Sequence, residues 1–309
     1  MNAQLQLFFT NIDKINLYFG SDAKSFYIDL ALKLTVRNIV FHYEDYEAVL
    51  QEIKNHTKWY HMARVNQQVI NTYYVHFTKQ PEKIGEALNL YKSLAKQFSR
   101  GEHSYITSAY LTSEDDMERI QKLSANLRKQ PSLKYYPIKP ATSAMLARRP
   151  EDTGILVQTI EHYYKELVSI GYERKDATKN AALILTLGTG TFDEFTFSRL
   201  QELTLFIKNT ETKLKSCHYA TIALLTLAKF EVHQFPALYD IHNEICRTLK
   251  LKRNQCNTLL ITTQIYTSNE AIGDIPSYES FYSDIIFSAI ESSSSDGGSG
   301  SDSGGGGGD

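Results

Sequence analysis

Ser108-Ala109-Tyr110-Leu111 and Ser143-Ala144-Met145-Leu146 are two copies of a short motif that carries the strongest structural signal in this chain. The second copy begins 35 residues after the first, and related copies recur every 35 to 41 positions. Each copy opens on a small or short polar residue: Ala31, Thr72, Ser108, Ser143, Ala181, Thr221 and Asn257. Three residues further on there is always an aliphatic residue: Leu34, Val75, Leu111, Leu146, Ile184, Leu224 and Leu260. Such a period is typical of stacked helix pairs.

The motif lies on the first helix of each predicted pair, and a longer amphipathic segment follows it. These second segments place apolar residues at spacings of three and four over residues 82–96, 115–128, 155–170, 197–207 and 235–249. A small side chain lets neighbouring backbones approach, and the aliphatic residue one turn later fills the core between pairs. The alternation typical of strands is nearly absent. The sequence therefore predicts an all-α fold, an α-solenoid of about seven helix hairpins with tetratricopeptide-like stacking and divergent repeats.

The C-terminus differs in composition from the rest of the chain. Residues 291–309 contain Ser, Gly and Asp after an initial Glu and no apolar residue, and eight of the 16 glycines follow residue 296. A segment of this kind does not bury enough apolar surface to offset its chain entropy. We expect an α-helical repeat domain over residues 1–290 and a disordered tail over residues 291–309.

Composition narrows the class of protein and its location. The net charge is −2 with a pI of about 6.5, whereas a repeat protein that follows a phosphate backbone is usually basic. Nucleic acid is therefore not the expected partner. The three cysteines, Cys217, Cys246 and Cys256, form no CxxC pair and do not suggest a disulfide framework, which suits a reducing compartment. The first 20 residues lack a signal-peptide pattern and no stretch is apolar enough to span a bilayer, so we expect a cytoplasmic protein without membrane contact.

The repeat layout, the phrase Cys217-His-Tyr-Ala-Thr-Ile-Ala-Leu-Leu225 and the Gly/Ser/Asp tail together resemble a protein family. This family is catalogued as domain of unknown function 4003 and is found mainly in Firmicutes. The resemblance covers essentially the whole chain and implies a helical, intracellular bacterial protein whose glycine-rich tail is native. The family has no established activity, so the resemblance transfers no site residue. The tetratricopeptide Trp-x2-Leu-Gly-x2-Tyr pattern is missing, and the only tryptophan is Trp59.

Five aromatic and histidine residues are candidates for a partner-binding groove: Tyr73, Tyr74, His103, Tyr110 and His218. Tyrosine combines apolar area with a hydrogen-bonding tip and is enriched at recognition surfaces. The two histidines each lie near the start of a predicted first helix and are closely followed by a tyrosine. Packing between helices is the alternative role for each of these residues.

His242 and Cys246 have the i, i+4 spacing that metal ligands use, and Cys217 with His218 could complete four ligands from a neighbouring repeat. The alternative is that Cys246 is a core residue, as free cysteine often is. No catalytic constellation is present, and we assign no catalytic, cofactor-binding or metal residue. We expect a non-enzymatic scaffold that binds a protein or peptide along a curved groove. The alternatives are a metal-binding protein or enzyme whose site forms between repeats, and an RNA-binding repeat protein.

Overall fold

The computed structural model describes residues 2–20, 24–98, 100–111, 115–134, 140–209, 214–251 and 256–268. Within these ranges the chain forms fourteen α-helices and four short 3-10 helices and no β-strand. The all-α prediction is therefore confirmed. The predicted tail over residues 291–309 and the predicted domain end at residue 290 lie outside the described residues.

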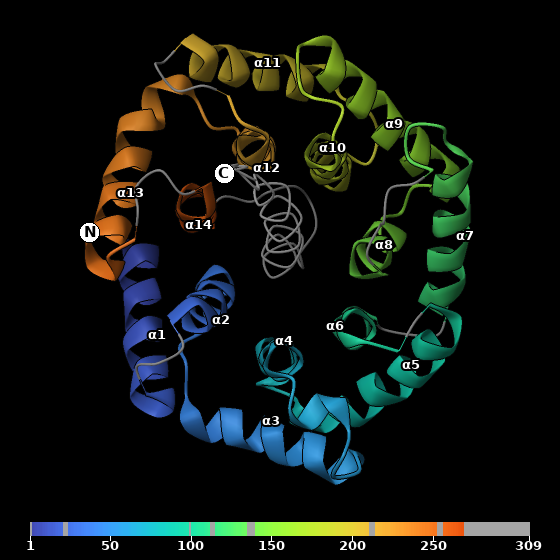
Figure 1. The fold of residues 1–309 in the computed structure, drawn as a ribbon, viewed down its shortest axis with the longest axis vertical. Helices are drawn as coiled ribbons and strands as arrows, with labels where there is room; N and C mark the ends of the chain where they lie inside the picture. Colours follow the sequence, from blue (N-terminus) through green and yellow to red (C-terminus); the bar gives the residue numbers. More distant parts are fainter. Residues whose placement is uncertain are drawn as a thin grey trace, which may run out of the picture.

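The helices form two concentric layers, each built from alternate helices of the chain (Figure 1). The outer layer consists of α1 (Ala3–Phe19), α3 (Tyr43–His56), α5 (Ile84–Gln97), α7 (Asp115–Lys129), α9 (Thr153–Ser169), α11 (Glu194–Asn209) and α13 (Phe235–Leu249). The inner layer consists of α2 (Lys24–Val36), α4 (Gln67–Phe77), α6 (Glu102–Tyr110), α8 (Pro140–Ala147), α10 (Asp176–Thr189), α12 (Tyr219–Leu227) and α14 (Cys256–Thr267). Each outer helix packs against the inner helix that follows it, which makes seven hairpins in the described chain.

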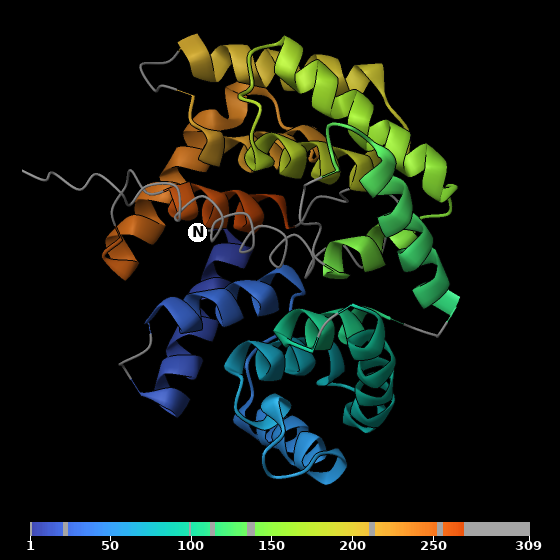
Figure 2. The ribbon, with the colours of Figure 1, turned by 45° about the vertical axis from the view of Figure 1, so that its right-hand side comes forward.

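The hairpins close into a ring because the last one packs against the first. Helix α14 contacts both α1 and α2, and a second view shows α13 and α14 beside the blue helices α1 and α2 (Figure 2). One continuous core cluster contains Leu5 and Phe8 of α1 together with Ile245 of α13 and Ile261 and Ile265 of α14. The solenoid prediction did not include this closure: an open array leaves the apolar faces of both terminal hairpins exposed, whereas here they cover each other.

The inner helices are covered by protein nearly all round, which explains their residue types. In α12 every residue from Tyr219 to Thr226 is buried, as expected for a helix that is apolar on all faces. Some buried threonine hydroxyls on these helices donate to the carbonyl four residues earlier, as Thr226 does to Ile222 at 2.8 Å and Thr186 does to Ala182 at 2.9 Å. The backbone thus satisfies these two hydroxyls, which would otherwise be buried without a partner.

The residues of the repeat motif all lie on the inner layer or directly after it. The small opening residues from Ala31 to Thr221 are at most 2% exposed, and the aliphatic residues three positions later are all buried. Asn257 lies on α14, but its side chain is not among those described. These positions are therefore packing positions, and a functional surface has to be found among the residues they leave uncovered.

Candidate functional site

The C-terminal ends of neighbouring inner helices meet on one side of the ring, which we call the C-terminal rim. Arg37 follows α2, and its Nη1 donates to the backbone carbonyl of Val75 near the end of α4 at 2.9 Å. The next residue, His76, lies with its ring 4.4 Å from the ring of Tyr110, the last residue of α6. Helices α2, α4 and α6 therefore run parallel.

An ion pair between the buried Arg149 and the partly buried Glu151 continues this rim from α8 to α10. Arg149 follows α8, and its Nη1 donates to the carbonyl of Leu187 in the last turn of α10 at 3.3 Å. Its Nε donates to Oε2 of Glu151 at 2.9 Å, so the guanidinium is shared between a carboxylate and a helix end. Gly190 ends α10 with φ at +73°, and a Cβ at this position would clash with both members of the pair.

The remaining inner helices meet in the same orientation. The ring of Phe230, after α12, lies 5.4 Å from the ring of Tyr266 near the end of α14. The C-terminal ends of parallel helices carry negative partial charge, and cations placed after them are stabilising. Arg37 and Arg149 fill this role directly because each donates to a carbonyl of the neighbouring helix.

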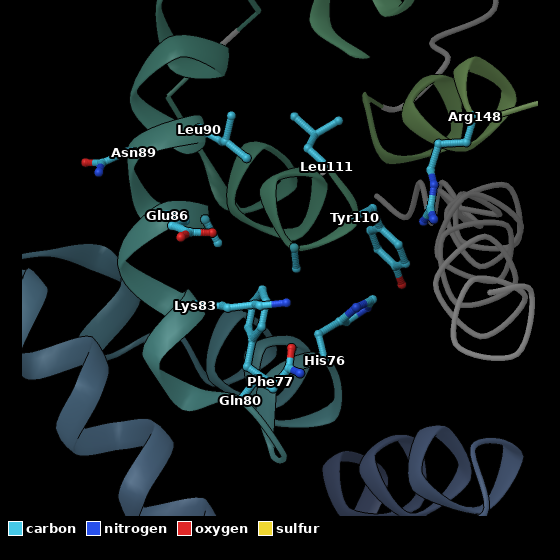
Figure 3. A pocket seen from close by; sticks show the side chains of 12 residues that line it. His76, Phe77, Gln80, Lys83, Glu86, Asn89, Leu90, Tyr110, Leu111 and Arg148 are labelled. Atoms are coloured by element: carbon cyan, nitrogen blue, oxygen red, sulfur yellow. The ribbon is translucent and has the colours of Figure 1, made fainter. Parts of the chain in front are cut away.

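A cavity of about 560 Å³ opens on the C-terminal rim between α4, α5, α6 and the end of α8 (Figure 3). Its polar lining consists of His76, Gln80, Lys83, Glu86, Asn89, Tyr110 and Arg148, and its apolar lining of Phe77, Ala87, Leu90, Ala109 and Leu111. Figure 3 shows the His76 ring beside the Tyr110 hydroxyl, with the Arg148 guanidinium approaching both from the end of α8. The cavity is large enough for a small ligand or for one or two side chains of a peptide.

The electrostatics of the cavity are dominated by cations around His76. Burial lowers the pKa of His76 well below its usual value, and the charges of Arg37, Lys33 and Arg148 lower this pKa further. The imidazole is therefore neutral at pH 7. Lys33 is itself buried and is paired with Asp29, whose Oδ2 lies 3.1 Å from its Nζ. The side chains of Lys83 and Arg148 are exposed, and neither forms an ion pair within the described part of the chain.

Of the five predicted groove residues, only Tyr110 lines this cavity. Tyr73 and Tyr74 come shortly before the cavity residue His76 in the sequence, but both are completely buried. The Tyr73 hydroxyl lies 2.8 Å from Oγ of Ser108, and the Tyr74 hydroxyl accepts a hydrogen bond from the His42 backbone N–H at 3.1 Å. Their place in a groove has to be corrected: both rings fill the core, and their hydroxyls are paired with protein groups.

The two predicted histidines both lie at the N-terminal ends of inner helices, on the side away from the C-terminal rim. His103 is the second residue of α6 and is exposed. His218 ends the 3-10 turn before α12 and accepts a hydrogen bond from the Lys215 backbone N–H at 3.3 Å. Burial and the Lys215 charge lower the pKa of His218. The five predicted residues therefore do not converge on one site.

The metal alternative brings only part of its residues together. His242 and Cys246 are buried, with 3.6 Å between Nε2 and Sγ, and Nδ1 of His242 lies 3.2 Å from Oγ1 of Thr262. Within the described ranges, no three His, Cys, Asp or Glu side chains come close enough to hold a metal ion. Cys217 takes part in a disulfide, contrary to the interpretation of the cysteine pattern, whereas Cys246 is a buried thiol outside any disulfide.

An exposed aromatic segment, which we call the aromatic loop, joins α3 to α4 over residues 57–66. It was missed by the sequence analysis. Trp59 is 81% exposed, Tyr60 64%, Val65 77% and Met62 38%, and the rings of Trp59 and Tyr60 lie 5.6 Å apart, edge to face. The only available signal was the aromatic pair itself, outside the repeat positions. Large apolar side chains grouped on a surface are typical of interaction sites.

The aromatic loop is held in place by its polar residues. The guanidinium of Arg64 donates from Nε to Oγ1 of Thr57 at 2.9 Å and from Nη2 to the carbonyls of Lys54 and Thr57. The Asn66 amide donates to Oε2 of Glu102 at 2.9 Å, and Ala63 within the loop is completely buried. The exposed rings are thus presented by an ordered backbone.

Comparison with known proteins gives a family and no functional relative. A family model described as "Protein of unknown function (DUF4003)" matches residues 13–280. No curated protein and no solved structure matches the chain. None of the helices within the described ranges is both long and apolar enough to cross a membrane.

Proposed function

The chain belongs to the DUF4003 family, and we propose that it is a non-enzymatic helical-repeat scaffold that binds a protein partner through the aromatic loop. The observation that carries this proposal is the exposure of Trp59 and Tyr60 on a loop that Arg64 fixes. Hairpins stacked in the manner of helical-repeat proteins supply the rigid frame.

The chemistry of the loop favours a protein partner. Tryptophan and tyrosine are enriched among the few residues that dominate interface energetics, and truncating such a hot-spot residue costs about 2 kcal/mol or more. Each ring has roughly 150–250 Å² of surface to bury at low conformational cost. Because the backbone is already ordered, binding does not have to order it.

The charges beside the loop indicate the kind of partner. Lys54 and Lys58 are exposed at its edge and form no ion pair within the described ranges. A complementary partner presents an apolar pocket with an acidic rim, since matched charges steer association and exclude other surfaces.

The test is affinity capture from the native host with three baits. The wild-type chain and the control Phe195→Ala should recover the same partner, whereas the double variant Trp59→Ala/Tyr60→Ala should lose it. Phe195 is a matched control because it is 86% exposed on α11, away from the loop. Equal recovery by all three baits would contradict the proposal.

A direct readout follows from Trp59 being the only tryptophan in the chain. Its emission reports on the aromatic loop alone. Addition of the purified partner should shift this emission to shorter wavelength and reduce quenching by acrylamide, because the indole leaves water. Binding without either change would place the interface elsewhere.

A further inference from the structure

The charge of this chain is divided sharply at the end of the last described helix. All 33 Lys and Arg residues precede residue 269, together with 27 of the 35 Asp and Glu residues, so residues 1–268 carry a formal charge of +6. Residues 269–309 contain no Lys or Arg and eight acidic residues, which gives −8. These acidic residues are Glu270, Asp274, Glu279, Asp284, Glu291, Asp296, Asp302 and Asp309. The bulk charge of −2 conceals this separation.

The acidic segment begins at the C-terminal rim. Helix α14 ends at Thr267, and its neighbour Tyr266 contacts Phe230 on that rim. The chain therefore leaves the described structure on the same side of the ring as the cavity.

The cavity at this rim has a surplus of cationic groups. Lys83 and Arg148 line it, and the charges of Arg37 and Lys33 act on His76 beside them. The acidic residues facing the same groups are Asp29, which is paired with Lys33, and Glu86. The aromatic and apolar lining adds surface on which the rings and aliphatic side chains of residues 275–290 can pack.

We propose that residues 269–309 dock their carboxylates against the cations of the C-terminal rim, so that the chain carries its own occupant for this cavity. Tethering makes the interaction intramolecular, with an effective concentration in the millimolar range for short linkers, so weak ion pairs suffice. The occupant is an acidic, Ser-rich segment with aromatic residues, and any external anionic ligand has to compete with it.

Chymotrypsin tests this proposal in the full-length chain. Its sites in the segment are Tyr278, Phe281, Tyr282 and Phe287, and mass spectrometry identifies the C-terminal fragments that each cut releases. In the wild type these cuts should be slow, and moderate salt should accelerate them because it screens exposed ion pairs.

Variants of the rim provide the decisive comparison. The double variant Lys83→Glu/Arg148→Glu should be cleaved in the segment roughly two to thirty times faster than the wild type, the range set by two exposed ion pairs. Arg174→Glu is the matched control, since Arg174 is exposed just before α10, at the opposite end of the inner helices. This control should be cleaved at the wild-type rate.

A charge swap separates docking from altered folding. Glu270, Asp274, Glu279 and Asp284 changed together to lysine should remove protection in the wild-type background and restore it in the Lys83→Glu/Arg148→Glu background. Equal cleavage of the wild type and the rim variant, or failure of the swap to restore protection, would overturn the proposal. The aromatic-loop capture experiment is independent of either result, since it tests a different surface.

Discussion

Ring closure has a testable energetic consequence at Ile265 of α14. This side chain is completely buried in the cluster that joins α13 and α14 to α1 and α2. Changing Ile265 to Ala removes three carbon atoms, which accounts for about 2.4 kcal/mol at roughly 0.8 kcal/mol per methylene. The residual cavity adds to this loss, so we expect a total of about 3 to 4 kcal/mol.

Native-state hydrogen exchange distinguishes a ring from an open array. In a ring, the Ile265→Ala variant should accelerate exchange in α1 and α2 as well as in α13, because α14 contacts all three. A local loss of about 3 kcal/mol corresponds to an exchange rate roughly 100-fold higher where opening limits exchange. In an open array, only α12 and α13 would respond.

Ile184→Ala is the matched control for this experiment. Ile184 is also an isoleucine that is 0% exposed on an inner helix, but it belongs to the cluster on the other side of the ring. Its loss of stability should be similar, with faster exchange first in α9, α10 and α12. If α1 and α2 exchange alike in the two variants, the reasoning about closure is refuted.

Three further predictions concern the rim and the aromatic loop. Burial and neighbouring cations depress the pKa of His76 in the folded chain, so the unfolded chain binds more protons at mildly acidic pH. Stability should therefore fall as the pH drops through about 6.5. His76→Gln should flatten this dependence of stability on pH, measured by urea titrations at several pH values. Arg64→Ala should lower the fluorescence anisotropy of Trp59 and cost about 1–2 kcal/mol, whereas unchanged anisotropy would show that the loop does not depend on these bonds. Gly190→Ala should cost at least about 1 kcal/mol in thermal unfolding, because Gly190 has a positive φ and an added Cβ clashes with the Arg149–Glu151 pair. Gly101→Ala, whose Cβ meets open space, should be close to neutral.

The location of the inner helices was readable from the sequence because it depends on local periodicity. The small residues at Ala31, Thr72 and Ser108 and the aliphatic residues that follow them recur at intervals set by the length of one hairpin, and the structure buries them. The helices that cover these residues are close to them in the sequence, so the pattern in one sequence is enough to predict their burial.

The site residues were harder to predict because tyrosine suits both a core and a surface. Tyr73 lies one residue after the motif opener Thr72, and Tyr110 lies two residues after Ser108. The Tyr73 hydroxyl is paired inside the core, whereas Tyr110 lines the cavity. Trp59 gave almost no signal because exposure depends on what packs above a side chain. No local pattern encodes that.

The sequence by itself determined the all-α class, the spacing of the hairpins and the segregation of acidic residues beyond residue 268, since each depends on residues close together in the chain. Only the tertiary structure decided that the stack closes, because the contact between α14 and α1 joins segments about 250 residues apart. The apolar face of each helix could pack against any other apolar face of similar shape. The tertiary structure also decided that the inner helices run parallel, which brings their C-terminal ends to one rim, where Arg148 and His76, far apart in the sequence, share a cavity. Because the hydrophobic effect is not directional, the sequence does not specify which distant segments pack together.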